Sequence, residues 1–433
     1  MNPYGFFIGL GAVIVLITVD RHLKDKVKLT DYLIIAVSTL FFARLGYFLN
    51  YMGLLAKDFV ELFRIHEGGL SIFGAFFGLS LAVFFISKAR EFQFLKFSDA
   101  ILLNFPLAQS IGRLGNYFNQ EIYGVPTSAP WGIFIKPENR FQEYINYTHY
   151  HPIFAYEIFL NILNWIFLLI LRKRYRLSVG LITCFYMLNY GLIRLSVNRF
   201  RIEKTFFLNI ETSDFFSVIL YTIGCIILIS MIFSKKTQLK VAEITSKVLN
   251  PFLITMIPFF IIAFQKDLFK IEPLHITIIF LIGLIGPIVQ IHLFKKLNLI
   301  NDWDISDRSK RPFFTVIAGT IFFLIFLVSL ASVSLEIKVL TLALTVATYI
   351  FAIISTKWKI SGHLTYLSFT LAAIYLLVKE PIFILLFSPL IVLVAWSRVK
   401  LKHHDVLQTI AGTLLGIGTI ISIWILATYP LPF

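Results

Sequence analysis

Apolar and polar stretches alternate along the whole chain. A bilayer core about 30 Å thick needs roughly 20 apolar residues in a helix. Apolar blocks of this size predict fourteen membrane spans in two groups of seven. The first group covers 4–19, 30–52, 68–87, 98–118, 153–171, 178–198 and 211–233, and the second covers 251–265, 273–294, 313–334, 339–356, 362–378, 381–396 and 406–428. The pattern therefore predicts an all-α polytopic membrane protein.

A polar stretch from Lys235 to Asn250 separates the two groups of spans. The halves share no motif and no repeat of fixed period stands out, which favours a fusion of two unrelated membrane domains over an inverted-repeat transporter. We predict one domain over residues 1–235, a cytoplasmic linker over 236–250 and a second helical domain over 251–433.

The composition agrees with a membrane protein. Of 433 residues, 58% are hydrophobic and only 15% are charged, whereas a soluble domain is about one quarter charged, so a soluble enzyme is excluded. The net charge of +15 would suggest nucleic acid in a soluble chain, but 25 of the 39 Lys and Arg residues lie in loops after odd-numbered spans. Because cytoplasmic loops retain positive charge, the excess predicts an N-terminus outside and no nucleic-acid partner.

The two cysteines, Cys184 and Cys225, lie inside apolar blocks. They have no metal-ligand spacing and form no disulfide framework. We expect neither a metal nor another cofactor, and we interpret both cysteines as packing residues.

Three cations fall within the predicted spans: Arg44, Arg113 and Arg194. An arginine at membrane depth costs at least ~2.5 kcal/mol, so it usually faces a polar cavity and has a partner there. One interpretation pairs each with an intramembrane acid such as Asp99 or Glu157. The other is that three arginines against two acids leave room for an anionic ligand such as a lipid phosphate, whose oxygens match guanidinium geometry.

Arg113 stands in a dense polar segment at the outer end of the fourth predicted span, residues 112–124. Glycines let the backbone come close to a ligand or a neighbouring helix. Here they alternate with cationic, amide and acidic side chains: Gly112, Arg113, Gly115, Asn116, Asn119, Glu121 and Gly124. A polar helix end followed by a turn is the alternative interpretation.

This segment resembles the signature of the prolipoprotein diacylglyceryl transferase family, Gly-Arg-x-Gly-Asn-x-x-Asn-x-Glu-x-x-Gly. The resemblance covers about residues 1–235 and implies seven spans with the N-terminus outside. Other agreements occur in the same order: Asn2-Pro3-Tyr4-Gly5, Ala43-Arg44-Leu45, Gly68-Gly69-Leu70-Ser71, Pro130-Trp131-Gly132, His151-Pro152 with Tyr156-Glu157, and Tyr190-Gly191 with Arg194 and Arg201.

The resemblance implies transfer of a diacylglyceryl group from phosphatidylglycerol in the lipid bilayer to the lipobox cysteine thiol of a prolipoprotein signal peptide, in a prokaryotic cell membrane. By resemblance, Arg113 and Arg201 would hold phosphate, Asn116 and Glu121 would order the site, and Gly124 would shape the loop. The further candidates for substrate binding are Arg44, Ser71, Asn119, Tyr156 and Arg194.

Two positions depart from that family. Phe73, which cannot accept a proton, stands where the family has a histidine. His66, two helical turns earlier, and His151 are therefore the candidates for the base that a thiol needs, and a merely interfacial role is the alternative for His66. At the second position, Asn198 stands between Arg194 and Arg201, where the family usually has a glutamate.

Three polar clusters in the second half follow spans nine, eleven and thirteen: residues 301–312, 361–363 and 397–404. Loops after odd-numbered spans share one membrane face, so these clusters can converge on a single site. Arginines with two histidines suit phosphoryl transfer, in which a histidine attacks phosphorus and guanidiniums neutralise the phosphoryl oxygens. A group of positively charged cytoplasmic loops is the alternative interpretation.

The order of these clusters resembles the phosphatidic acid phosphatase type 2 superfamily. By that resemblance His404 would be the nucleophile and His363 the proton donor. The phosphate ligands would be Arg308, Arg311, Ser361, Gly362 and Arg398. Three positions depart from the pattern, because Asp304, Ile360 and Gln408 replace its lysine, proline and aspartate.

Diacylglyceryl transfer to lipoproteins is the leading hypothesis. The alternatives are a catalytically degenerate lipid-binding scaffold and a membrane lipid phosphatase that uses the second domain. By the charge count, residues 112–124 face outward whereas His363, Arg398 and His404 face the cytoplasm, which predicts two sites on opposite membrane faces.

Overall fold

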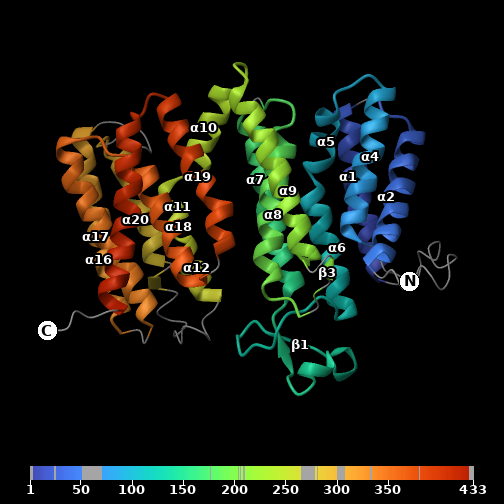
Figure 1. Ribbon diagram of the computed structural model, residues 1–433, viewed down its shortest axis with the longest axis horizontal. Helices are drawn as coiled ribbons and strands as arrows, with labels where there is room; N and C mark the ends of the chain where they lie inside the picture. Colours follow the sequence, from blue (N-terminus) through green and yellow to red (C-terminus); the bar gives the residue numbers. More distant parts are fainter. Residues whose placement is uncertain are drawn as a thin grey trace. The chain divides into compact units, whose positions relative to one another are not determined.

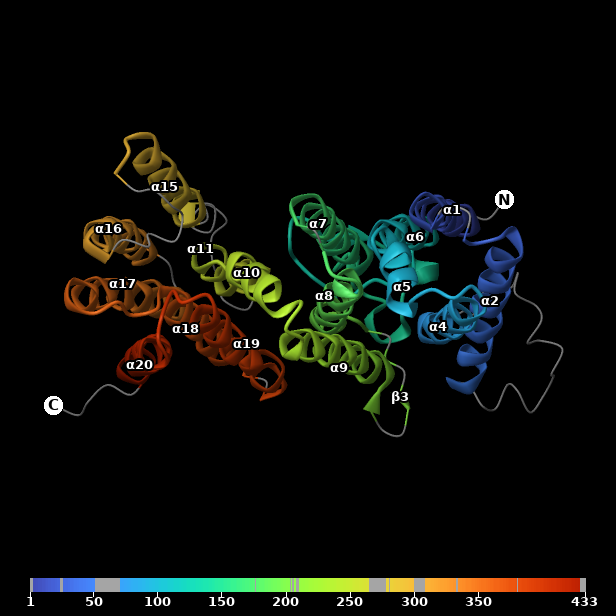
Figure 2. The same cartoon turned by 90° about the horizontal axis from the view of Figure 1, so that it is seen from above.

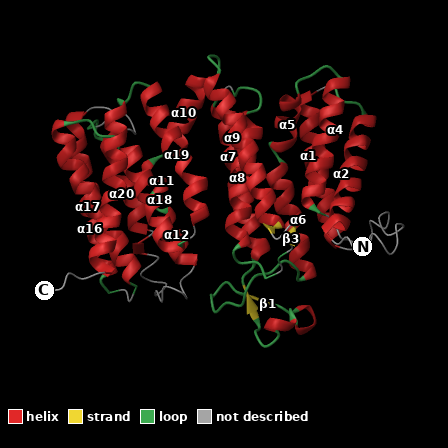
Figure 3. Cartoon of the chain, in the orientation of Figure 1, coloured by secondary structure: helices red, strands yellow, loops and turns green. Residues whose placement is uncertain are grey.

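The computed structural model describes most of the chain: residues 3–23, 26–50, 71–175, 177–202, 204, 206–207, 210–264, 278–279, 281–299, 308–331, 334–379 and 381–428. These residues divide into two compact units, Met1–Phe233 and Ser234–Phe433. Helices make up nearly all of the regular structure described in both units, as the colours of Figure 3 show. The prediction of an all-α polytopic membrane protein is confirmed.

The first unit is a bundle whose helices run side by side, with the segment that carries β1 projecting beyond one end (Figure 1). The α-helices described in it are α1 (Pro3–Leu23), α2 (Leu29–Asn50), α4 (Ile72–Ala89), α5 (Phe94–Leu102), α6 (Phe105–Asn119), α7 (Ile153–Arg174), α8 (Leu181–Asn198) and α9 (Thr212–Phe233). Its described residues also form two antiparallel strand pairs and two 3-10 turns. The pairs are β1 (Ile133–Phe134) with β2 (His149–Tyr150) and β3 (Phe206–Phe207) with β4 (Ile210–Glu211), and the turns are η3 (Pro137–Asn139) and η4 (Gln142–Tyr144).

Small residues allow a close helix contact in the first unit, between α2 and α4 (Figure 2). A Cβ atom at Gly74 would overlap the carbonyl oxygen of Phe42, and one at Gly78 would overlap that of Ser38. The Ser38 hydroxyl donates to the Gly78 carbonyl at 2.8 Å. Backbones that approach this closely pack well at membrane depth, where no hydrophobic force drives helices together.

The predicted span 98–118 is wrong as a single helix. The structure ends α5 at Leu102 and begins α6 at Phe105. Pro106 lies in the first turn of α6, and its ring and missing N–H prevent a helix from continuing through it. Asn104 lies in this break and links it to α1 and α7. Its side chain donates to the Thr18 hydroxyl at 2.6 Å and accepts from the Trp165 indole at 2.7 Å.

The second unit is also helical. The elements that its described residues form are α10 (Gln238–Val248), α11 (Pro251–Ile254), α12 (Ile257–Phe264), the π-helical turn η5 (Leu281–Ile285), α15 (Gly286–Lys296), the 3-10 turn η6 (Arg308–Lys310), α16 (Arg311–Ser329), α17 (Leu335–Lys357), α18 (Gly362–Val378), α19 (Pro381–Lys400) and α20 (Val406–Thr428). Residues 236–250, predicted as a linker, thus contain α10. Its Val241, Ala242 and Ile244 are buried, and the helix packs against α19.

Seven described helices are long and apolar enough to cross a membrane: α1, α2, α7, α9, α16, α17 and α20. Phe73–Ala89 and Gly362–Val378 are shorter apolar helices. The predicted span 251–265 is divided between α11 and α12, and 273–294 lies partly outside the described residues. The total of fourteen spans therefore stays a prediction.

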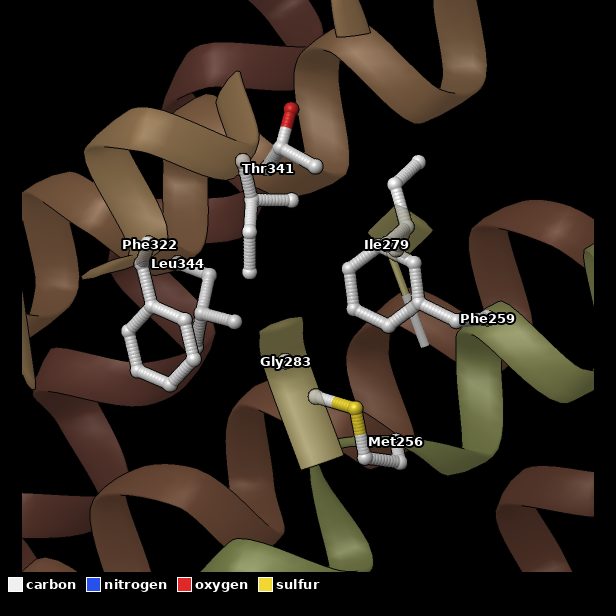
Figure 4. Close-up of a pocket in the computed structure, with 8 residues that line it drawn as sticks. Met256, Phe259, Ile279, Gly283, Phe322, Thr341 and Leu344 are labelled. Carbon is white, nitrogen blue, oxygen red and sulfur yellow. The ribbon is translucent and has the colours of Figure 1, made fainter. Parts of the chain in front are cut away.

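A narrow apolar gap in the second unit is too small to hold a water molecule. Met256, Phe259, Gly283 and Phe322 are among the residues around it (Figure 4). The hydroxyl of Thr341, its polar neighbour, already donates to the Ile337 carbonyl at 2.7 Å. Apolar cavities of this kind stay dry, so we interpret this one as imperfect packing.

Candidate functional site

A buried acid joins four helices of the first unit. Glu157 on α7 is fully buried, and its Oε2 lies 2.5 Å from the Nε of Arg113 on α6. Its Oε1 forms an ion pair with Arg194 on α8, and Arg194 also donates to the Ser213 hydroxyl on α9 at 2.8 Å. Pairing with an intramembrane acid is therefore the interpretation that holds for Arg113 and Arg194.

Asp99, the other acid considered as an arginine partner, has a different role. Its carboxylate accepts from the backbone N–H groups of Gly180 at 2.6 Å and Thr183 at 2.8 Å, and from the Thr183 hydroxyl at 2.7 Å. These donors belong to the first turn of α8. A carboxylate at a helix N-terminus satisfies N–H groups that have no partner within the helix, so Asp99 fixes the start of the helix that carries Arg194.

Three arginines act electrostatically on Glu157: Arg113, Arg194 and Arg201. Arg201 follows α8, and its backbone forms a β-bridge with Gly124. Guanidiniums concentrated around one carboxylate create a positive potential that favours a further anion, and their planar donors match phosphate oxygens.

The end of α6 carries a chain of hydrogen bonds from buried to exposed groups. Arg113 donates to the Asn116 Oδ1 at 3.2 Å, and the Asn116 Nδ2 donates to the Glu121 Oε1 at 2.8 Å. Asn119 donates to the same Glu121 oxygen at 3.2 Å. Asn116 is buried, whereas Asn119 and Glu121 are exposed. The structure thus brings four predicted site residues into one connected group.

A tight turn follows α6. Gln120 and Ile122 both have positive φ angles, 52° and 55°, which L-residues with a side chain rarely adopt. At Gly124 the N–H donates to the His151 carbonyl at 2.8 Å, and a Cβ atom would lie 2.5 Å from the Phe200 carbonyl oxygen. No side chain fits at position 124 without moving the turn away from the end of α8.

His151 is the candidate base that the structure describes. Its Nδ1 lies 2.8 Å from the Tyr156 hydroxyl, which also accepts from the Trp131 indole N–H at 2.9 Å. The His151 ring packs against Phe200 with 5.1 Å between the centroids. His66, the other candidate, lies outside the described residues.

Phe73 and Asn198, the two positions that depart from the family pattern, both contact residues at or near the start of α9. Phe73 stacks on Phe216, with ring centroids 4.2 Å apart. The Asn198 amide donates to the carboxylates of Glu211 and Asp214. Burial and the nearby Asp214 charge raise the pKa of Glu211. Sequence reasoning missed this acid pair, although two acids at the start of an apolar span were a signal.

Two predicted substrate-binding residues lie on a different pair of helices, at the contact between α2 and α4. Arg44 is buried, and its guanidinium lies 4.9 Å from the centre of the Phe48 ring. The Ser71 hydroxyl accepts from the Gly74 N–H at 3.3 Å and so caps α4. The Ser71 N–H donates to the Ala43 carbonyl at 2.9 Å.

Comparison with known proteins decides the family of the chain. Residues 1–230 match the family model described as prolipoprotein diacylglyceryl transferase, which is more than half of the chain. The chain belongs to the prolipoprotein diacylglyceryl transferase family. This confirms the resemblance predicted for the first half, and the match to that family ends close to the end of the first unit at Phe233.

Named members of the transferase family align with this chain over part of its length. The phosphatidylglycerol–prolipoprotein diacylglyceryl transferase of Thermotoga petrophila is 37% identical over 166 residues, which are 38% of this chain and 57% of the relative. That of Synechococcus elongatus is 32% identical over 169 residues, 38% of this chain and 58% of the relative. That of Synechocystis sp. is 30% identical over 232 residues, 51% of this chain and 82% of the relative. The chain thus spans little more than half the length of the first two relatives.

Beyond the part matched to the transferase family, a second polar group lies at one end of the second unit. The His404 Nδ1 lies 3.0 Å from both the Lys359 carbonyl oxygen and the Gln408 Oε1. A carbonyl can only accept, so Nδ1 carries the proton and Nε2 carries the lone pair. Burial and the charges of Arg398 and Arg311 lower the pKa of His404 to about 4, and the ring is therefore neutral at pH 7.

The described parts of the three polar clusters, residues 308–312, 361–363 and 397–404, converge around His404, whereas 301–307, with Asp304, lie outside the described residues. Arg311 at the start of α16 donates to the Ile360 carbonyl at 3.3 Å, and the Ser361 N–H donates to the Gln408 carbonyl at 3.2 Å. The backbone N–H of His404 donates to the Arg398 carbonyl at 3.3 Å. The predicted residues Arg311, Ser361, His363, Arg398 and His404 are all buried. Gly362 begins α18, and Arg308 begins η6.

Proposed function

We propose that this chain transfers a diacylglyceryl group from phosphatidylglycerol to the lipobox cysteine thiol of prolipoproteins. The observation that carries the proposal is the position of Arg113, which contacts buried Glu157 and also begins the chain of hydrogen bonds to exposed Glu121. The names of the family members supply the substrates. A cation that reaches from a buried acid toward solvent can meet a lipid headgroup without leaving its own partner.

The reaction needs positive charge at the leaving group. The thiol sulfur attacks the carbon of the diacylglyceryl moiety that bears the phosphate. A C–S bond forms and the bond from that carbon to the phosphate oxygen breaks, so that glycerol phosphate leaves with the electron pair. Negative charge grows on the phosphate in the transition state, and preorganised guanidiniums stabilise it there. Arg113, Arg194 and Arg201 are the residues for this role, and Arg44 is a candidate contact for the remainder of the lipid.

The thiol must lose its proton during the attack, and His151 is our candidate for the acceptor. Its contact with Tyr156, which Trp131 also contacts, orients the ring. The outer loop, through Trp131, is thus connected to the proton acceptor. We propose that Asn119, Ser71 and Gly124 shape the substrate site around these groups, as the family resemblance implies.

The site is proposed to face outward from a prokaryotic cell membrane, with the N-terminus outside. Support comes from the excess of Lys and Arg in loops after odd-numbered spans. The substrate would enter from the bilayer and the signal peptide would meet the outer loop.

The test is release of glycerol phosphate from phosphatidylglycerol vesicles by the purified full chain, with a lipobox peptide present. The account predicts release that depends on the peptide cysteine, and none when that cysteine is serine. Arg113→Ala should lose at least about 100-fold in rate, the typical loss for a group that stabilises transition-state charge. Arg199→Ala, which removes an exposed arginine just after α8, is the matched control. An Arg113→Ala rate close to that of the control would contradict the role of Arg113.

We propose phosphoryl transfer as a second function, located in the second unit. Its resemblance to the phosphatidic acid phosphatase type 2 superfamily stays a prediction, and the convergence of Arg311, Ser361 and Arg398 around a neutral His404 supports it. In this reaction His404 Nε2 attacks the phosphorus of a phosphomonoester, the P–N bond forms as the P–O bond to the alcohol breaks, and the leaving alcohol takes a proton from protonated His363, the donor that the resemblance implies. Water then cleaves the P–N bond, releases inorganic phosphate and regenerates the histidine.

Phosphatidic acid in mixed micelles is the substrate for testing this second function. Release of inorganic phosphate by the full chain, lost in His404→Asn and retained in Arg113→Ala, would support two independent sites. No release by the unsubstituted chain would contradict this function and favour the lipid-binding scaffold.

A further inference from the structure

Ser246 on α10 contacts two residues of the second polar group, although it lies outside all three sequence clusters. Its hydroxyl oxygen accepts from the Arg398 Nη1 at 2.6 Å, and its carbonyl oxygen accepts from the His363 Nε2 at 3.1 Å. One turn earlier, the Ala242 carbonyl accepts from the Ser397 hydroxyl at 2.6 Å. The helix α10 therefore holds the arginine and the histidine that the sequence placed at a phosphate site.

The hydroxyl hydrogen of Ser246 is left without an acceptor among the described residues. Its oxygen accepts from Arg398, so the hydrogen points elsewhere. A helical serine often donates to the carbonyl four residues earlier, but here the Ala242 carbonyl accepts from Ser397. Ser246 is only 5% exposed, so water gives little compensation.

A second buried hydroxyl of this polar group, that of Ser361, also lacks a hydrogen-bond acceptor within the described ranges. Ser361 is fully buried, and its Oγ has no hydrogen-bond partner in the part of the chain that the structure describes. Buried polar groups are almost always paired. The Ser246 hydroxyl contacts Arg398, and Ser361 directly follows Ile360, whose carbonyl accepts from Arg311. Two such buried hydroxyl donors close to arginines indicate an acceptor-rich ligand, and an oxyanion with several oxygens satisfies such donors together.

We propose that Ser246 completes an oxyanion site in the second unit, where it accepts from Arg398 and donates its hydroxyl hydrogen to a phosphate oxygen of a phosphomonoester. The inference rests on the proposed phosphoryl transfer function and extends it to a fourth structural element. Donors then come from α10, α16, α19 and the N-cap residue of α18. The site is incomplete without α10, the helix that follows the part matched to the transferase family.

The test measures binding of inorganic phosphate to the purified full chain, in detergent. Ser246→Ala should raise the dissociation constant for phosphate about tenfold, the usual effect of losing a hydrogen bond to a charged group. The control is Ser329→Ala, which removes an equally buried hydroxyl at the far end of α16 from Arg311. The control should bind phosphate within about twofold of the unsubstituted chain.

Two further measurements separate a binding role from a folding role. Without phosphate, both alanine variants should still melt cooperatively, although Ser246→Ala loses an acceptor of the buried Arg398 guanidinium. Ser246→Thr, which keeps the hydroxyl, should bind phosphate more tightly than Ser246→Ala. Equal phosphate affinity in both alanine variants would overturn the role of Ser246 and leave phosphoryl transfer standing. Failure of the unsubstituted chain to bind phosphate at all would overturn phosphoryl transfer and this inference together.

Discussion

Replacing Glu157 with glutamine should strongly destabilise the first unit. Glu157→Gln keeps the size of the side chain but removes the charge that faces Arg113 and Arg194. Glu157 is fully buried and Arg194 is 3% exposed, so water cannot replace the lost carboxylate. Removing one partner of a buried ion pair costs roughly 3–5 kcal/mol. Because one acid here serves two guanidiniums, we expect a loss of about 4 kcal/mol in the free energy of unfolding.

The assay is unfolding of the purified full chain by increasing denaturing detergent in mixed micelles, followed by circular dichroism. Glu143→Gln, which removes an exposed carboxylate in η4, is the control and should change stability by less than about 0.5 kcal/mol. The double variant Glu157→Gln/Arg194→Gln should recover part of the lost free energy of unfolding, because it no longer buries the Arg194 charge without its carboxylate. A loss below about 1 kcal/mol in Glu157→Gln would refute the view that this acid neutralises the arginines.

Three further predictions concern thiols, pH and sidedness. Replacing Cys184 and Cys225 with serine should leave transfer intact, and a covalent lipid on either thiol would contradict their assignment as packing residues. His404 has a pKa of about 4 against the usual 6.5, so the unfolded chain takes up a proton between these values that the folded chain does not. The free energy of unfolding should fall by up to about 3 kcal/mol as pH drops from 6.5 to 4. Chemical denaturation at both pH values measures this fall, which should be absent in His404→Gln. In a chain without its own cysteines, single cysteines at Asn146 and Lys402 should react with an impermeant thiol reagent from opposite sides of oriented vesicles, and labelling of both from one side would contradict the predicted topology.

The hydrogen-bonded group at the end of α6 could be predicted from the sequence. Arg113, Asn116 and Asn119 recur every three residues, so they share one face of a helix, and Glu121 follows within the turn. Their connection in the structure is a consequence of local helical geometry. Pro106 is a comparable local signal for the break before α6, because a proline is compatible with the first turn of a helix but not with its interior.

The partner of the arginines could not be predicted in the same way. Asp99 and Glu157 both stand alone in apolar blocks, and only the packing of α6, α7 and α8 decides that Glu157 meets Arg113 and Arg194. The Asp99 carboxylate instead accepts hydrogen bonds from backbone N–H groups at the start of α8. Sequence spacing carries no information on such contacts between distant helices.

The role of α10 was missed for a different reason. Its charged and polar residues led to the interpretation of 236–250 as a linker, although Val241, Ile244 and Val248 recur at helical spacing. The burial of Val241 and Ile244, and the contact of Ser246 with Arg398, depend on the packing of α19 against α10.

The mass of a lipobox peptide tests the central claim most directly. The purified full chain, incubated with phosphatidylglycerol of defined acyl chains and a peptide that carries one cysteine, should raise the peptide mass by one diacylglyceryl unit, held by a thioether that survives reduction. The Arg113→Ala chain should give no such product, while Arg199→Ala should give as much as the unsubstituted chain. An unchanged peptide mass with the unsubstituted chain, under conditions in which a transferase of the same family from Thermotoga petrophila modifies the peptide, would contradict the account.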